Sequence, residues 1–414
     1  MIPKMDEYKK RWAIESDDAI KPGLEAIQEA LALVGNPEAD LQIIHVAGTN
    51  GKGSTIAFME GILRQHGFST VVFSSPALID IHDQIRLNGH PISTEDLDTA
   101  FKLIKKVGLS GKLTDFELLT VAAFVACRQF APDFVLLETG MGGKLDSTNV
   151  VIPLVSVITS IALDHTSFLG ETLEKITDHK AGVIKAKKPI VIGALPKEAL
   201  AVIQYTAREL HSELFAYGEQ FTLTTEDAFN GLQTFQLNGR GMKGAHQGVN
   251  AAVAIEALLA AGVMLEEDKV AGGIATTQLP FRFQEVFPGV FMDGAHNPAA
   301  AKVLTETIQL EFPGEKVDFI IGMLKGKDVE QTLNELVPVA ASFTFVTFPH
   351  LQAEKPEKLM EYCHHEKKKM TNIESDTIIL EKECGRRTIV TGSLYMISRL
   401  MTHSLGFQNR SDLS

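Results

Sequence analysis

Short apolar runs alternate with stretches of helical period along most of the first half of the chain. The spacing predicts strands at residues 43–47, 70–73, 133–138, 154–159 and 189–193, and helices at 55–66, 116–130 and 173–185. The runs DFVLLE and LVSVIT do not alternate between apolar and polar residues, which is typical of parallel strands buried on both faces. Strands separated by helices in this way predict βαβ units and a largely parallel sheet.

The alternation is interrupted once, after a predicted helix at residues 247–261. The segment TTQLPFRF at 276–283 contains a proline and several polar residues. Beyond it the pattern restarts, with strands predicted at 290–292, 317–322, 343–348 and 388–391, helices at 299–310 and 329–336, and a terminal helix. We therefore expect two α/β domains, residues 1–280 and residues 281–414.

Composition restricts the classes of partner and compartment. Of the 414 residues, 45% are hydrophobic and 22% are charged, as in an ordinary globular protein. The 39 Lys and Arg residues against 52 Asp and Glu give a formal charge of −13, which disfavours nucleic acid and anionic membranes as partners. No apolar run approaches the ~18 residues of a membrane helix, and the charged start MIPKMDEYKKRW does not resemble a signal peptide. The widely spaced Cys127, Cys363 and Cys384 indicate reduced thiols, so we expect a cytoplasmic protein.

A glycine-rich segment between a predicted strand and a predicted helix carries the strongest chemical signal. It consists of Gly48, Thr49, Asn50, Gly51, Lys52, Gly53 and Ser54. Backbone N–H groups in such a loop converge on phosphate oxygens, and the lysine reaches the β- and γ-phosphates. Gly53 occupies the position where the usual motif has a Mg²⁺-binding hydroxyl, and Val46 occupies the position of its first glycine. Either Ser54 replaces that hydroxyl, or the metal is bound from elsewhere in the chain.

Two downstream segments are candidates for binding such a metal. Glu138 ends a predicted buried strand and precedes three glycines, where the carboxyl ends of parallel strands bind ligands. A carboxylate there suits Mg²⁺, which prefers oxygen ligands. Asp164 and His165 follow the next predicted strand, and Lys180 lies in the helix after it. An isolated histidine or lysine is more often structural, so His165 and Lys180 are candidates only because of the motifs around them.

Ten motifs in one order identify a resemblance that extends from about residue 22 to residue 400. They are HVAGTNGKGST, SSP, TDFELLT, ETGMGGKLDSTN, LDHTSFLGET, KAGVIK, HQGVN, DGAHNP, KGKD and TGSLY. Together they resemble the folylpolyglutamate synthase/dihydrofolate synthase family of Mur-type, ADP-forming amide ligases. The resemblance implies a large N-terminal P-loop domain, a smaller C-terminal Rossmann-like domain and an active site in the cleft between them. It also implies the reaction, in which ATP activates the carboxylate of a folate or dihydropteroate as an acyl phosphate that L-glutamate then attacks.

The resemblance also assigns roles to individual residues. Lys52, His165 and Lys180 would be catalytic, with a carbamylated Lys180, and two Mg²⁺ ions would be bound by Ser75, Glu138, His165 and the modified Lys180. Asn250 would bind adenine, Arg282 and Asp293 would contact phosphate and ribose, and His296 would line the same cleft. A monovalent cation and a monomeric enzyme are further implications.

The chain departs from the family pattern at several positions, and those at residues 77–85 lie in a loop that is near the folate in the family. The chain has Ala77, Asp83, Gln84 and His179 where the family usually has His, Glu, Arg and Glu. Neutral drift explains them most simply. A Mur-type ligase with another acceptor and a catalytically silent nucleotide-binding relative are the alternatives. The choice between dihydropteroate and tetrahydrofolate, and the length of any polyglutamate product, stay open.

Overall fold

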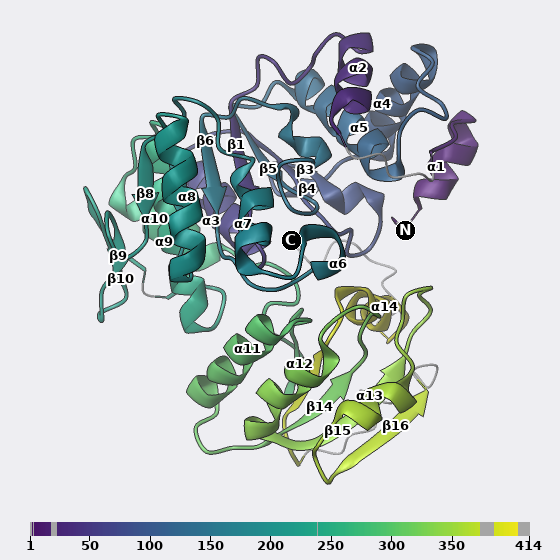
Figure 1. Cartoon of the computed structure of the whole chain (residues 1–414), viewed down its shortest axis with the longest axis vertical. Coiled ribbons are helices and arrows are strands. Elements are labelled where there is room, and N and C mark those ends of the chain that lie inside the picture. The colour runs from purple at the N-terminus through teal and green to yellow at the C-terminus, as the bar shows by residue number, and fades with distance from the viewer. Residues whose placement is uncertain (1, 3, 18–22, 238, 373–384, 405–414) are drawn as a thin grey trace. The chain divides into compact units, whose positions relative to one another are not determined.

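The computed structural model describes residues 2, 4–17, 23–237, 239–372 and 385–404. The chain divides into two compact units (Figure 1). The first contains residues 1–241 and 247–277, and the second contains residues 242–246 and 278–414. Cys384 lies outside the described residues, while Cys127 and Cys363 are buried free thiols.

The first unit is built on an eight-stranded sheet of order β4-β3-β2-β5-β1-β6-β7-β8. Six of its strands are parallel; they are β1 (Ile43–Ala47), β2 (Thr70–Phe73), β5 (Phe134–Glu138), β6 (Val155–Ile158), β7 (Ile190–Ile192) and β8 (Leu214–Ala216). The alternation predicts the first five of these and the parallel arrangement, but not β8. The pattern did not predict the antiparallel edge strands β3 (Ile85–Leu87) and β4 (His90–Pro91). It also missed a small antiparallel sheet of β9 (Thr222–Leu223), β10 (Ala228–Asn230) and β11 (Thr234–Gln236).

Helices cover both faces of the large sheet. Ile43, Val71, Phe73, Val135 and Leu137 point to one face, where they pack with residues of α1 (Met5–Trp12), α2 (Glu25–Leu33), α4 (Thr94–Lys106) and α5 (Asp115–Phe130). Farther along the same face, β6 and β7 pack against α7 (Leu173–Ala181) and α8 (Lys197–Glu209). On the other face, α3 (Lys52–Gln65) contacts β1, β2 and β5 and packs closely with α10 (Glu267–Thr276). The unit also contains α6 (Thr166–Leu169), α9 (Ala245–Ala260), η1 (Ile81–Gln84) and η2 (Ser147–Val150).

Several helix ends differ from the prediction for local reasons. Helix α3 begins at Lys52 rather than at residue 55, because Gly51 takes the left-handed conformation at its N-cap. Helix α7 ends at Ala181 rather than at residue 185, and Gly182 is its C-cap. Helix α5 begins where Thr114 and Glu117 form a capping box, in which each side chain binds the other residue's backbone N–H.

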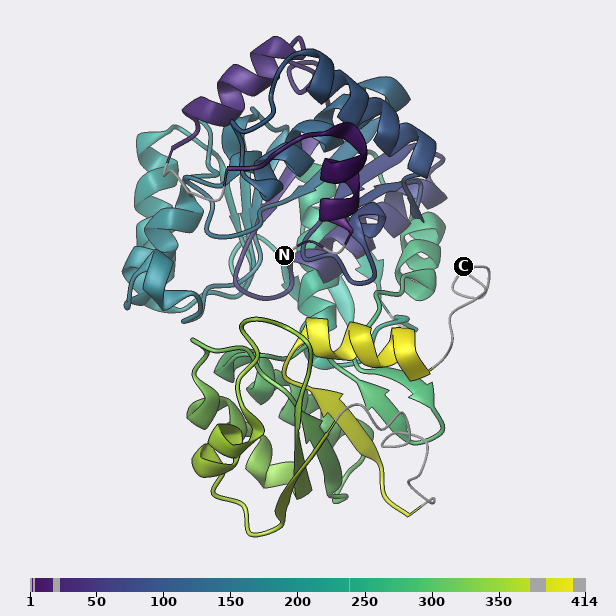
Figure 2. The ribbon, with the colours of Figure 1, turned by 90° about the vertical axis from the view of Figure 1, so that its right-hand side faces the viewer.

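The second unit has a six-stranded sheet of order β12-β13-β17-β14-β15-β16. Its strands are β12 (Gln284–Phe287), β13 (Val290–Met292), β14 (Val317–Ile321), β15 (Ala340–Thr347), β16 (Lys368–Asn372) and β17 (Thr388–Thr391), and β12 alone of these runs antiparallel to its neighbour. Helices α11 (Pro298–Glu311), α12 (Val329–Leu336) and α13 (Pro356–Tyr362) share a core with this sheet, together with η3 (Val337–Val339). The last helix, α14 (Leu394–Ser404), lies beside β17 (Figure 2). Within the described residues, no helix has the length and apolar character needed to cross a bilayer.

Candidate active site

Four adjacent strands of the first unit carry the predicted site residues at one edge of the sheet. The strand order β2-β5-β1-β6 places side by side the segments that follow Phe73, Glu138, Ala47 and Ile158. Because these strands are parallel, their carboxyl ends meet at a single edge, which is where open α/β sheets bind ligands. Ser75, Glu138, the glycine-rich loop and His165 all come from this edge.

The glycine-rich loop has a backbone that only glycine fits at two positions. Gly48 has a φ of 155°, and a Cβ atom there would lie 2.0 Å from Thr159 Oγ1. Gly51 has a φ of 87°, and its Cβ would lie 2.6 Å from Asn250 Oδ1. The loop therefore passes directly against neighbouring side chains before α3 begins at Lys52.

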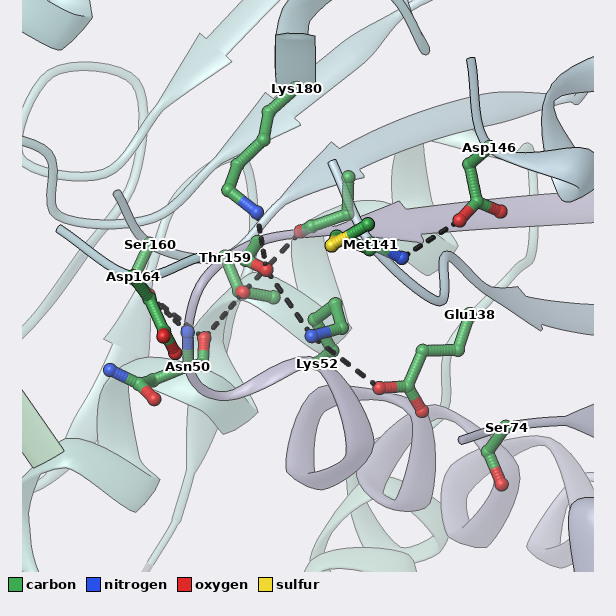
Figure 3. A network of polar contacts seen from close by, with 12 residues as sticks. Asn50, Lys52, Ser74, Glu138, Met141, Asp146, Thr159, Ser160, Asp164 and Lys180 are labelled. Carbon is green, nitrogen blue, oxygen red and sulfur yellow. Dashed lines mark hydrogen bonds and ion pairs between the residues drawn. The ribbon is translucent and has the colours of Figure 1, made fainter. Parts of the chain in front are cut away.

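Thr159 and Ser160, which follow β6, hold the loop in this shape. The Ser160 hydroxyl accepts a hydrogen bond from the N–H of Asn50 at 2.9 Å, and the N–H of Thr49 donates to the Ser160 carbonyl at 2.9 Å. The Thr159 hydroxyl donates to the Asn50 carbonyl at 2.7 Å (Figure 3). Neither residue is predicted from the sequence above, although a pair of hydroxyl residues at the end of a buried strand is a detectable signal.

Lys52 and Lys180 converge on the same backbone atom of the loop. Lys52 Nζ lies 3.2 Å from the Gly48 carbonyl oxygen and 3.7 Å from Glu138 Oε1. Lys180 Nζ donates to the same Gly48 carbonyl at 2.9 Å (Figure 3). The structure thus brings together three predicted site residues from α3, β5 and α7.

The environment of Lys180 is unusual for a lysine. The residue is buried, and desolvation lowers the pKa of its amine to about 7, helped by the positive charge of Lys52 and opposed by Asp164 and Asp146. A substantial fraction of the amine is therefore neutral near pH 7. A buried amine with a strongly lowered pKa, beside a glycine-rich loop at a sheet edge, is typical of a functional group.

His165 and Ser75 lie on the segments expected for them. His165 is exposed, has a φ of 49° and occupies the N-cap of α6, and its N–H donates to Asp164 Oδ1 at 2.8 Å. Ser75 is half-buried in the segment after β2. No three Asp, Glu, His or Cys side chains of the described residues gather into a metal-binding group. A metal at this edge would therefore need further ligands such as serine, a modified lysine or phosphate.

The residues that depart from the family pattern have structural partners. The Asp83 carboxylate accepts hydrogen bonds from the N–H groups of Leu78 and Asp80, at 3.0 and 3.2 Å, and also from Ile79. Gln84 Nε2 donates to the Ser74 carbonyl at 3.1 Å. Both residues therefore build the loop after β2.

The predicted adenine ligand lies beside the loop. Asn250 is buried in α9, its Nδ2 donates to Gln247 Oε1 at 3.0 Å, and its Oδ1 faces Gly51. The amide is thus oriented by a neighbour one helical turn earlier.

The remaining predicted residues group together in the second unit. Asp293 accepts hydrogen bonds from the N–H groups of Phe283 and Ala295, both at 2.9 Å. Desolvation raises the pKa of this carboxyl, and the charge of Arg282 opposes the rise. His296 Nδ1 lies 2.8 Å from the Gly294 carbonyl oxygen. The neighbouring Asn297 caps α11, since its side-chain Oδ1 accepts a hydrogen bond from the N–H of Ala300 at 2.9 Å.

Two protein-family models match parts of the chain. "Mur ligase middle domain" matches residues 46–258, and "Dihydrofolate synthetase, C-terminal domain" matches residues 284–403. Among curated relatives, the dihydrofolate synthase/folylpolyglutamate synthase of Bacillus subtilis is 35% identical, over 92% of this chain and 94% of the relative. The protein of the same description from Escherichia coli is 33% identical, over 92% and 90%.

Solved structures agree with these matches. E. coli FolC in complex with DHPP and ADP has a TM-score of 0.88 and 31% identity, and the match covers 98% of both chains. A bifunctional folylpolyglutamate synthase/dihydrofolate synthase with Mn, AMPPNP and L-glutamate bound has a TM-score of 0.85 and 29% identity, over 94% of this chain and 95% of that one. Both structures contain a nucleotide, and the second also contains a divalent metal.

Proposed function

Because this chain belongs to the folylpolyglutamate synthase/dihydrofolate synthase family, we propose that it joins L-glutamate to the carboxylate of a folate or a dihydropteroate and converts ATP to ADP. The observation that carries the proposal is that Lys52 and Lys180 both contact the Gly48 carbonyl while Lys52 also lies 3.7 Å from Glu138 Oε1. We call the glycine-rich loop of residues 48–54 the phosphate loop from here on. Such a loop, with a carboxylate and a second amine close to its lysine, suits phosphoryl transfer to a substrate carboxylate.

The reaction has two steps, and the residues mainly position groups and neutralise charge. A carboxylate oxygen of the acceptor forms a bond to the γ-phosphorus, and the bond to the β,γ-bridging oxygen breaks to release ADP. The glutamate amine then attacks the acyl carbon, loses a proton and expels phosphate. Lys52 and the N–H groups of the loop would offset the negative charge that moves onto the β-phosphate.

The donor set fits a hard divalent metal. Glu138 offers a buried carboxylate at the sheet edge, Ser75 a hydroxyl and His165 an imidazole. The carboxylate and hydroxyl oxygens of Glu138 and Ser75 are ligands of the kind that suit Mg²⁺ and Mn²⁺. We propose two such sites, at which the metal would offset the charge of the β- and γ-phosphates when bound.

Lys180 is proposed to be carbamylated. Its neutral amine would attack CO₂, form an N–C bond and lose a proton, so that a buried amine becomes an anion able to bind metal. The pKa of about 7 supports this, since only the neutral amine reacts. A monovalent cation, which the resemblance implies, belongs to the same proposal and is tested by replacing potassium with a large organic cation.

We propose two domains, residues 1–280 and 281–414, with candidate nucleotide ligands in each of them. Asn250 would recognise adenine, Arg282 and Asp293 would contact phosphate and ribose, and His296 would lie near them. The opposed charges of Arg282 and Asp293, and the proximity of Asn250 to the loop, support these roles. We also propose a monomer that acts in the cytoplasm, in keeping with the buried free thiols.

The test is ATP-dependent phosphate release with Mg²⁺ and glutamate, run in parallel with dihydropteroate and with tetrahydrofolate, followed by the mass of the product. We expect release with at least one acceptor and a product heavier by one glutamyl residue. A product with dihydropteroate would identify a dihydrofolate synthase. Products with both acceptors would identify a bifunctional enzyme. Normal ATP binding without release from either acceptor would contradict the proposal.

A further inference from the structure

Buried side chains build the turn of residues 140–149, which follows Glu138. The Asp146 carboxylate accepts hydrogen bonds from the N–H of Met141 at 2.8 Å and from the N–H and hydroxyl of Thr148 at 3.0 and 2.6 Å (Figure 3 shows the Met141 bond). Asp146 and Thr148 are both buried. The carboxylate of Asp146 therefore links Met141 near the start of the turn to Thr148 near its end.

A histidine anchors this turn to the strand that leads into the phosphate loop. His45 of β1 is fully buried, and its Nε2 lies 2.9 Å from Thr148 Oγ1. Because the single hydroxyl proton of Thr148 is donated to Asp146, Nε2 of His45 must carry a proton and donate to Thr148. Burial lowers the pKa of His45 to about 3, with a smaller contribution from the charge of Lys185, so the ring is neutral.

Other residues of the turn form hydrogen bonds to the C-terminal end of α7, the helix that carries Lys180. The N–H of Lys144 donates to the His179 carbonyl at 2.6 Å, and Asn149 Nδ2 donates to the carbonyls of Lys144 and Gly182 at 3.1 and 3.0 Å. A Cβ on Gly143 would lie 2.8 and 3.0 Å from the carbonyl oxygens of His179 and Lys180. The turn and the helix end are thus in backbone contact on both sides of Lys180.

We propose that Thr148 and Asn149 are positioning residues, which fix the amine of Lys180 relative to the carboxylate of Glu138 through the 140–149 turn. The inference rests on the proposed function, in which both of these groups are metal ligands. Neither Thr148 nor Asn149 touches the reacting atoms in this role. Loss of their bonds changes metal affinity, because outer partners that orient a ligand govern how well it binds.

Thr148→Val and Thr148→Ser form the first test. Valine keeps the shape but leaves the His45 N–H without an acceptor and Asp146 without one donor, whereas serine keeps the hydroxyl. The measurements are calorimetric affinity for Mn²⁺ in the presence of ADP and the melting temperature. We expect Thr148→Val to weaken Mn²⁺ binding by about 10-fold or more and Thr148→Ser by less than about 2-fold. Thr206→Val, which removes a hydroxyl bonded to Val202 within α8, is the control and leaves Mn²⁺ affinity unchanged.

Asn149→Ser provides an independent and milder variant, since the shorter side chain cannot reach both carbonyls. A similar loss of Mn²⁺ affinity supports the proposal even if Thr148→Val does not fold. Lower melting temperatures with unchanged Mn²⁺ affinity in the folded variants would overturn it, because a purely structural role predicts that result. The binding measurement needs no acceptor, so it is decisive even if the wild-type protein ligates neither folate nor dihydropteroate.

Discussion

At the scale of single residues, Lys180 offers the sharpest test of the chemistry. Its replacement in Lys180→Ala removes the buried amine at the Gly48 carbonyl and any group formed on it. We expect kcat to fall by about 100-fold or more while ATP binding persists, because the phosphate loop stays intact. Lys175→Ala, an exposed position on the same helix, is the control and keeps wild-type turnover. Unchanged turnover in Lys180→Ala would contradict the catalytic role.

A second residue, Glu256, links stability to pH. Burial raises the pKa of this carboxyl to about 7, whereas an unfolded glutamate titrates near ~4.3. Between these values the folded protein retains a proton that the unfolded chain releases, so stability falls as pH rises from about 4.5 to 7. Glu256→Gln has no such titration. We expect its unfolding free energy to match the wild type near pH 4.5 and to exceed it by about 2–3 kcal/mol at pH 8. Equal pH profiles from urea unfolding would disprove this.

At the scale of elements, the phosphate loop depends on contact with the segment after β6. An alanine at Gly48 would place its Cβ 2.0 Å from Thr159 Oγ1, so Thr159 would have to release its bond to the Asn50 carbonyl. We expect Gly48→Ala to weaken ATP binding by more than about 10-fold, equivalent to about 1.4 kcal/mol.

The matched control for that loop variant is Gly67→Ala. Gly67 has a φ of 86°, and a Cβ there meets nothing within 4 Å. This variant suffers only the conformational penalty of about 1–2 kcal/mol in stability, with ATP affinity unchanged. Equal nucleotide affinities for both variants would show that the contact with Thr159 does not shape the loop.

The elements also show which features a sequence pattern can reveal. Strands 43–47 and 388–391 were predicted to the residue, because a buried parallel strand is a continuous apolar run between turn residues. Strands β9, β10 and β11 are two or three residues long and carry no such run. The phosphate loop and Glu138 could be predicted because a strand end and neighbouring glycines mark them. The bond from His45 to Thr148 could not, because it joins positions 103 residues apart and only the β1–β5 pairing brings them together.

At the scale of the whole molecule, the proposed nucleotide ligands are distributed over both units. The phosphate loop and Asn250 belong to the first, and Arg282 and Asp293 to the second. A ligand that binds only the native state stabilises the folded region that binds it, by about 2.7 kcal/mol when the free ligand concentration is 100 times Kd. If the assignments are correct, Mg²⁺ and ADP should slow amide hydrogen exchange in peptides that cover residues 43–60 and also in those that cover residues 281–300.

The distribution of slowed amide exchange between residues 43–60 and residues 281–300 tests the roles assigned to Arg282 and Asp293. Asp293→Asn keeps an acceptor oxygen for only one of the two N–H groups of Phe283 and Ala295, and it removes the charge that faces Arg282. In this variant we expect protection at 43–60 to persist and protection at 281–300 to diminish, together with a weaker affinity for ADP. Protection confined to 43–60 in the wild type would mean that the first unit alone binds the nucleotide. The proposed role of the glycine-rich loop in binding phosphate would then stand, while Arg282, Asp293 and His296 would need a different role. Binding of a glutamate carboxylate to the guanidinium of Arg282 is then the next role to test.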